Sequence, residues 1–280
     1  MSGYKTGSVT SADGTVIGYR QLGSGPAVIL LHGGMLAAQH LMRLADVLSS
    51  RYTVYLPDRR GRGVSGPHGA DYRIAREVED VQALAAASDA SRIFGLSSGA
   101  LVALRTALEI PSIARVAVYE PPLDVDGSVP VSWVPRFDRE IAAGKPASAL
   151  VTALKGLDVE PVFGRIPRFV LVPLMTTAMR LQRGGPAHEV PVAELIPTMH
   201  LDLRLIEEMT GTAKDYAALD TPVLLLGGAN SPAYFARILD ELHRVLPHAE
   251  RVTFPKLGHS GTENDGDPQV VGETLLRFFG

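Results

Sequence analysis

A short glycine-bounded segment in the first half of the sequence carries a serine with the setting of a nucleophile. It reads GLSSG over residues 95–99 and lies between an apolar run and a predicted helix over 98–109. A serine hydroxyl is a weak nucleophile until a neighbouring base takes its proton, so it must be held exposed and near a histidine. A tight strand-to-helix turn provides that exposure, and its glycines let the helix pack closely on the strand. This pattern predicts Ser97 as the nucleophile.

A second glycine-rich turn, HGG at residues 32–34, follows an apolar run over 27–31. Its backbone N–H groups can face the oxyanion that develops when a serine attacks a carbonyl, and Gly34 is the predicted donor. The second predicted donor is the N–H of Ser98, which also lies at the positive end of the following helix. Each such donor is worth about 3 kcal/mol in the transition state. A plain structural turn is the alternative interpretation of Gly33 and Gly34.

His259 is the predicted general base among the eight histidines. It follows Gly258 in a late loop after the last predicted strand, where a base could reach a serine at the end of an earlier strand. His68, also in a loop, is the alternative. A further group lies in helical or cap segments without a glycine-bounded turn and is interpreted as surface or packing residues: His40, His188, His200, His243 and His248.

Short β-rich runs alternate with helical periodicity around these residues, which is typical of a mostly parallel central sheet flanked by helices. The predicted strands are 15–21, 27–31, 52–56, 92–95, 114–119, 222–226 and 251–254, and the predicted helices are 36–49, 74–87, 98–109, 232–246 and 268–279. Residues 121–216 differ, because recurrent prolines break them into short helical pieces. We therefore expect an α/β fold with a core of 1–120 and 217–280 and an inserted helical cap of 121–216.

Taken together, these features resemble the α/β-hydrolase superfamily, particularly its cap-bearing, cofactor-independent members, over nearly the whole chain. The segment DRRGRGVSG at 58–66 is similar to the family's D-x-R-G-x-G-x-S loop, and P-x-x-G-H at 255–259 is similar to its histidine loop. The resemblance implies that Ser97 and His259 take the nucleophile and base roles, and that no cofactor is needed.

The sequence departs from the family at the catalytic acid. The family usually has G-x-x-D after the strand that here is 222–226, but residues 227–230 read GGAN. An amide such as Asn230 cannot stabilise an imidazolium by charge, and the corresponding change in a serine protease costs about 10⁴ in turnover. Other members carry the acid just after the strand that precedes the cap, which implies Glu120 here, since catalytic groups gather at the carboxyl ends of such strands. Asp124 is the reserve candidate, and a surface glutamate at the cap entrance is the alternative interpretation.

Composition narrows the class of protein further. The chain has 280 residues, 46% of them hydrophobic and 20% charged, which allows a sizeable core without staples. A net charge of −3 without basic, aromatic-interleaved stretches argues against a nucleic-acid partner. Cysteine is absent, and no metal-ligand spacing or phosphate loop occurs. The polar N-terminus and the lack of a long apolar run predict a cytoplasmic protein with no membrane association.

The cap segment is rich in apolar and thioether side chains, which adapt to irregular ligands. They are Trp133, Phe137, Phe163, Phe169, Leu171, Leu174, Met175, Met179 and Met199. We expect most of them to pack between cap and core and a minority to contact a small, largely apolar substrate.

The predicted activity is hydrolysis of an ester, lactone or thioester through an acyl-enzyme. Acyl transfer, cyclisation, carbon–carbon bond cleavage or ligand binding in the same pocket is the alternative, and either a monomer or a homodimer is expected.

Overall fold

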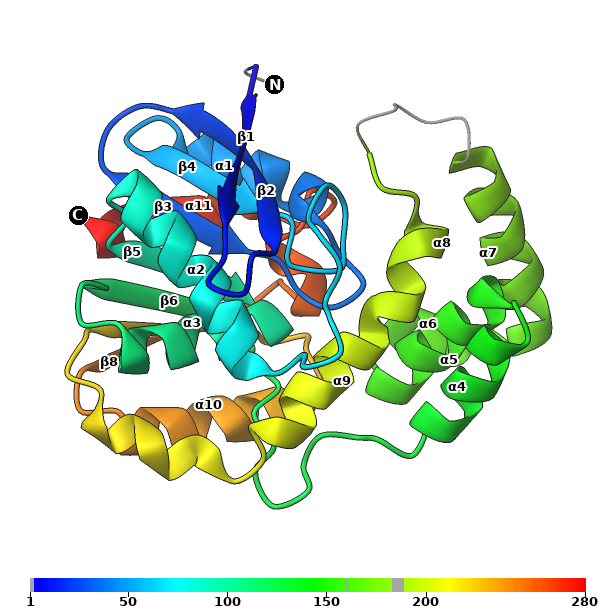
Figure 1. The fold of residues 1–280 in the computed structure, drawn as a ribbon. Helices are drawn as coiled ribbons and strands as arrows, with labels where there is room; N and C mark the ends of the chain where they lie inside the picture. The colour runs from blue at the N-terminus through cyan, green and yellow to red at the C-terminus, as the bar shows by residue number, and fades with distance from the viewer. Residues whose placement is uncertain (1–2, 160, 183–188) are drawn as a thin grey trace.

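An eight-stranded sheet forms the centre of the computed structural model, which describes residues 3–159, 161–182 and 189–280 (Figure 1). Its strands are β1 (Lys5–Thr10), β2 (Val16–Gly23), β3 (Ala27–Leu31), β4 (Thr53–Pro57), β5 (Arg92–Leu96), β6 (Arg115–Tyr119), β7 (Val223–Gly228) and β8 (Ala249–Phe254). The spatial order is β1-β2-β4-β3-β5-β6-β7-β8. Strand β2 is antiparallel to both its neighbours, and all pairs from β4 to β8 are parallel. The predicted mostly parallel sheet is confirmed.

Helices cover both faces of this sheet, so its central strands are apolar throughout. In β3 all five residues are buried, and they alternate between two apolar clusters. Ile29 and Leu31 face the cluster under α2 (Ile74–Ser88), α3 (Ser98–Glu109) and α10 (Ala233–Val245). Val28 and Leu30 face the cluster under α1 (Met42–Leu48) and α11 (Pro268–Phe279). A continuous apolar run is what a parallel strand buried on both faces requires.

Two elements differ from the expectation. Strand β1 was not predicted, because its sequence KTGSVT is polar and mostly exposed and gives no apolar periodicity. It forms by antiparallel pairing with the edge of β2, with Lys5 opposite Gln21 and Thr10 opposite Val16. The helix predicted over 36–49 is divided into a 3₁₀ helix, η1 (Ala38–Leu41), followed directly by α1.

The segment between β6 and β7 is helical, and its first helices form a separate lobe beside the core (Figure 1). It contains α4 (Val134–Ala142), α5 (Pro146–Leu157), α6 (Pro161–Arg165), α7 (Arg168–Gln182), α8 (Val192–Leu195), the 3₁₀ helix η2 (Ile196–Thr198), α9 (Met199–Glu208) and the 3₁₀ helix η3 (Thr212–Ala218). Prolines begin several of them: Pro135, Pro146 and Pro197 occupy first-turn positions, where no backbone N–H is needed.

The lobe has its own apolar cluster, which includes Trp133, Phe137, Met179 and Met199. These four side chains were expected to pack between cap and core, but they belong to the lobe's own cluster, and Phe169 of α7 is 80% exposed. Helix α9 lies between lobe and core (Figure 1). Leu201, Leu205 and Ile206 of α9, with Ala213 and Tyr216 of η3, belong to the core cluster next to α3.

Candidate active site

Ser97 lies on a strained turn between β5 and α3. Its φ of 53° is in the left-handed region that non-glycine residues rarely adopt, and its backbone N–H donates to the carbonyl of Tyr119 at 2.9 Å. A Cβ on Gly99 would lie 2.5 Å from the carbonyl oxygen of His32, and one on Gly95 would overlap the Gly99 carbonyl. The two glycines therefore allow the close crossing of strand and helix that the sequence pattern predicted.

Glu120 and His259 meet directly. Glu120 follows the end of β6, is 1% exposed, and places Oε2 at 2.7 Å from Nδ1 of His259. Its other oxygen, Oε1, accepts the backbone N–H of Gly228 at 2.7 Å, so both carboxylate oxygens are engaged and the group cannot rotate freely. This is the contact that the predicted acid role of Glu120 requires.

The competing candidates lie elsewhere. The amide of Asn230 is exposed and donates to the carbonyl of Lys256 at 3.0 Å. Asp124 accepts the backbone N–H of Val129 at 2.9 Å and so closes a local turn at the start of the cap segment. His68 is exposed, and its Nδ1 lies 2.7 Å from the carbonyl of Gly69. None of the three contacts His259 among the hydrogen bonds of the described residues.

Two aromatic side chains hold the histidine loop. The ring of Phe235, from α10, stacks on the imidazole of His259 with centroids 4.5 Å apart and an interplanar angle of 10°. The hydroxyl of Tyr119 donates to the carbonyl of Gly258 at 2.7 Å. These two contacts hold the histidine loop in place.

The Nε2 atom of His259 is available to a serine, because Nδ1 is bound to Glu120. No hydrogen bond joins Ser97 Oγ to His259 within the described residues, and such catalytic contacts commonly tighten only when substrate binds.

The HGG turn is held by a buried, neutral histidine. His32 Nδ1 lies 2.9 Å from the carbonyl of Gly33, and its Nε2 accepts the backbone N–H of Arg59 at 3.1 Å. Burial, together with the positive charges of Arg62 and Arg59, lowers the pKa of His32 well below its usual value. A Cβ on Gly33 would lie 3.1 Å from the Cβ of Ser97, so the turn passes directly beside the nucleophile, as the expected oxyanion role requires.

A buried group of charged side chains lies next to this turn and was not predicted. Arg59 pairs with Glu77 at 2.9 Å and with Asp202 at 3.1 Å, and Arg62 pairs with Asp202 at 2.7 Å. Asp202 also accepts a hydrogen bond from Ser98 Oγ at 2.7 Å. Asp202 belongs to no sequence motif. The sequence feature that could have pointed to this group is the pair Arg59 and Arg62, which lie in one loop and need buried acidic partners.

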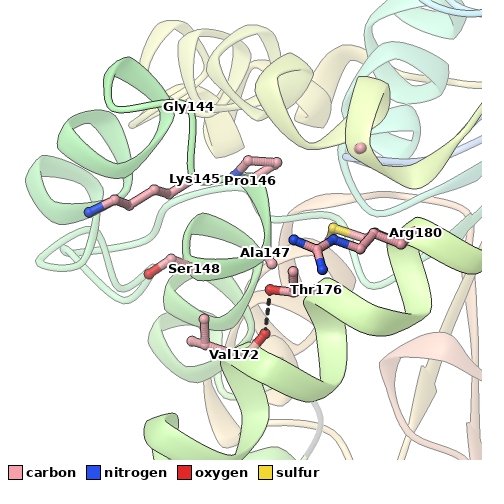
Figure 2. Close-up of a pocket in the computed structure, with 10 residues that line it drawn as sticks. Gly144, Lys145, Pro146, Ala147, Ser148, Val172, Thr176 and Arg180 are labelled. Carbon is pink, nitrogen blue, oxygen red and sulfur yellow. Dashed lines mark hydrogen bonds between the residues drawn. The ribbon is translucent and has the colours of Figure 1, made fainter.

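A cavity of about 550 Å³ opens within the cap lobe, between α5, α7 and α8 (Figure 2). Its lining combines the cations Lys145 and Arg180 with apolar side chains such as Val172 and Met179. In Figure 2, Thr176 Oγ1 donates to the carbonyl of Val172 at 2.7 Å. Neither Ser97, His259 nor Glu120 lines this cavity, so it is distinct from the catalytic residues.

The described residues contain no group of three or more histidine, aspartate or glutamate side chains arranged to hold a metal ion. None of their helices is both long and apolar enough to cross a membrane.

The sheet order, the strained serine after β5 and the histidine loop after β8 define an α/β-hydrolase fold. The chain belongs to the alpha/beta hydrolase family, whose profile matches residues 28–273. It is a hydrolase of this fold, as its relatives also indicate.

One similar protein is a pimeloyl-[acyl-carrier protein] methyl ester esterase from Xanthomonas axonopodis pv. citri, which is 24% identical over 92% of this chain and 96% of that protein. A solved α/β hydrolase from Sphaerobacter thermophilus is 30% identical and superposes with a TM-score of 0.79. The superposition covers 98% of this chain and 100% of that one. A solved esterase from a Rhodococcus species shares the fold with a TM-score of 0.72 at 21% identity, with 98% of each chain covered.

Proposed function

We propose that this protein is a serine hydrolase that cleaves an ester, lactone or thioester bond of a small, largely apolar substrate. The observation that carries the proposal is the 2.7 Å contact between Glu120 Oε2 and His259 Nδ1, which is partly buried and lies beside the strained turn of Ser97. A carboxylate in this position orients the imidazole and stabilises the imidazolium that forms when the serine loses its proton.

The proposed reaction has two halves. Ser97 Oγ attacks the carbonyl carbon while His259 Nε2 takes its proton, and the backbone N–H groups of Gly34 and Ser98 bind the oxyanion. The carbonyl re-forms, the bond to the alcohol or thiol breaks, and the leaving group takes the proton from His259. Water then loses a proton to His259 and attacks the acyl-serine, which releases the acid and restores Ser97.

Two observations support an apolar ester as substrate. The relatives named above include esterases, and an ester carbonyl is the group that this arrangement of nucleophile, base and oxyanion donors attacks. Met35, directly after Gly34, packs against the apolar cluster of the cap, so cap side chains adjoin the reaction centre. An apolar acyl or alcohol group would bury its surface there.

Asn230 gives no support to a non-hydrolytic function. That alternative arose because the family's usual acid position holds an amide, but Asn230 makes its hydrogen bond to Lys256 while Glu120 contacts His259. The acid role in the proposed mechanism does not involve Asn230.

A fluorophosphonate probe with intact-mass measurement tests the proposal. We expect one phosphonyl adduct on the wild-type protein and none on Ser97→Ala. Ser231→Ala is the matched control, since Ser231 Oγ is buried without a hydrogen-bond partner in the described structure and should label normally. An unlabelled wild type, or an adduct that survives Ser97→Ala, would contradict the proposal. Turnover of p-nitrophenyl esters of graded acyl length, with lactones and thioesters, would then define the substrate class.

A further inference from the structure

Three buried charges meet at the junction of core and cap. Arg59 and Arg62 come from the loop after β4, and Asp202 comes from α9, more than 130 residues later in the chain. Their side chains are at most 1% exposed. An unpaired charge in such a setting is costly, so a buried carboxylate between two guanidinium groups has a defined position.

Asp202 contacts both residues that are expected to donate to the oxyanion. Its Oδ1 accepts the hydroxyl of Ser98 at 2.7 Å. A Cβ on Gly34 would lie 3.0 Å from its Oδ2, so the backbone of Gly34 lies directly against the carboxylate. One cap side chain therefore hydrogen-bonds Ser98 and lies next to Gly34, the two sides of the predicted oxyanion hole.

Arg59 reinforces the same arrangement from the core. Its Nη1 donates to Asp202 Oδ1 at 3.1 Å, to Ser98 Oγ at 3.0 Å and to the carbonyl of His32 at 3.3 Å. The start of the HGG turn and the first residue of α3 are thus connected to one guanidinium group. Its position depends on Asp202 and on Glu77, which pair with it.

The charge of Asp202 is compensated within the group. Burial by itself would raise the pKa of Asp202, but Arg62 and Arg59 outweigh it and hold the pKa below its usual value. The carboxylate is therefore ionised, and its negative charge is directed at the arginines. Its influence on the reaction comes from where it holds the backbone.

We propose that Asp202 is a positioning residue for the oxyanion hole, an inference that rests on the serine-hydrolase function proposed above. It fixes Ser98 and Gly34 so that their N–H groups converge on one oxygen of the substrate. The cap segment thereby completes the catalytic centre of the core.

Two variants test this role. Asp202→Asn keeps the size of the side chain but removes its charge. Ser98→Ala removes the hydrogen bonds of the Ser98 hydroxyl to Asp202 and Arg59, while Asp202 and Arg59 stay paired with each other. We expect kcat for p-nitrophenyl esters to fall about 10- to 100-fold while KM stays nearly constant, because the oxyanion exists only in the transition state. The affinity for a trifluoromethyl ketone, which forms a tetrahedral adduct on the serine, should fall by the same factor as kcat/KM.

Asp80→Asn is the matched control. Asp80 forms a similar buried pair with Arg60, from the same loop, at 2.6 Å, but its side chain bonds neither Ser98 nor the HGG turn within the described residues. This variant should lose stability but keep kcat and inhibitor affinity near the wild-type values. If Asp202→Asn does not fold, Ser98→Ala decides the question on its own.

Two results would overturn the positioning role of Asp202 but leave the proposed function standing. One is unchanged kcat and inhibitor affinity in Ser98→Ala and in any folded Asp202→Asn. The other is an equal loss in Asp80→Asn, which would indicate a general effect of stability. Failure of the wild-type protein to react with a fluorophosphonate would instead overturn the proposed function, and the inference with it.

Discussion

Ser97 and Glu120 both have left-handed backbone conformations, with φ of 53° and 48°. They follow the ends of the adjacent parallel strands β5 and β6, where Gly95 pairs with Val118 and Leu96 with Tyr119. Such conformations cost about 1 to 3 kcal/mol each and persist where surrounding contacts determine them. Here the backbone N–H of Ser97 is bound by Tyr119 and that of Glu120 by Leu226, so neighbouring strands hold both turns.

The role of Glu120 leads to a prediction for two variants. Glu120→Gln should lower kcat by about 10³- to 10⁴-fold with little change in KM, because an amide cannot stabilise the imidazolium of His259 by charge. Asn230→Ala should retain nearly full activity, since within the described residues its side chain hydrogen-bonds the backbone of Lys256 and not His259. Steady-state kinetics on a p-nitrophenyl ester measures both. Full activity in Glu120→Gln together with loss of activity in Asn230→Ala would show that Glu120 is not the catalytic acid.

At the scale of elements, the crossing of β5 and α3 depends on the absence of a side chain at Gly99. A Cβ there would lie 2.5 Å from the carbonyl oxygen of His32 and 2.6 Å from that of Leu31. Both atoms belong to the backbone at the end of β3, next to the HGG turn, so neither can move without displacing the turn. The same close approach brings nucleophile and oxyanion turn together.

Gly99→Ala should therefore destabilise the protein by about 2 kcal/mol or more, through overpacking against backbone. Urea unfolding followed by circular dichroism measures the change. Gly164→Ala is the control, because among the described residues the nearest atom to its Cβ would be Asp158 Oδ1, at an ordinary 3.4 Å. Equal stability of the two variants would mean that β3 and α3 can separate without cost.

At the scale of the whole molecule, the cap lobe and the sheet have separate apolar clusters, and α9 connects them. Phe137 is fully buried in the lobe, where it packs edge-to-face on Trp133 with ring centroids 5.6 Å apart. Leu225 is fully buried in the core cluster beside β6 and β8. Local unfolding tends to occur in contiguous cooperative units, so the lobe and the core are expected to open separately.

Phe137→Ala should cost about 3 to 5 kcal/mol in the stability of the lobe. Hydrogen exchange should accelerate in α4, α5 and α7, while the amides of β5, β6 and β7 keep their protection. Leu225→Ala, the control in the core, should accelerate exchange in the sheet as well. If Phe137→Ala exposes the sheet amides to the same extent, lobe and core unfold as one unit.

Local sequence patterns were enough to predict most of the elements and the turn at Ser97. Short β-rich runs that alternate with helical periodicity predicted seven of the eight strands of the described structure, and glycine spacing located the turns around Ser97, His32 and His259. These features depend on hydrogen bonding and burial over a few residues, which neighbouring side chains encode. Strand β1 lacks that signal, since it is polar and forms only by pairing with β2.

Contacts between groups far apart in the chain became visible in the folded structure. Glu120 and His259 are 139 positions apart, and Asp124 and Asn230 were competing candidates for that contact. Asp202 and Arg59 are 143 positions apart, in segments without a shared motif. Local patterns carry no information about such pairs, because their meeting depends on how the ends of β6 and β8, the HGG turn and α9 pack at one edge of the sheet.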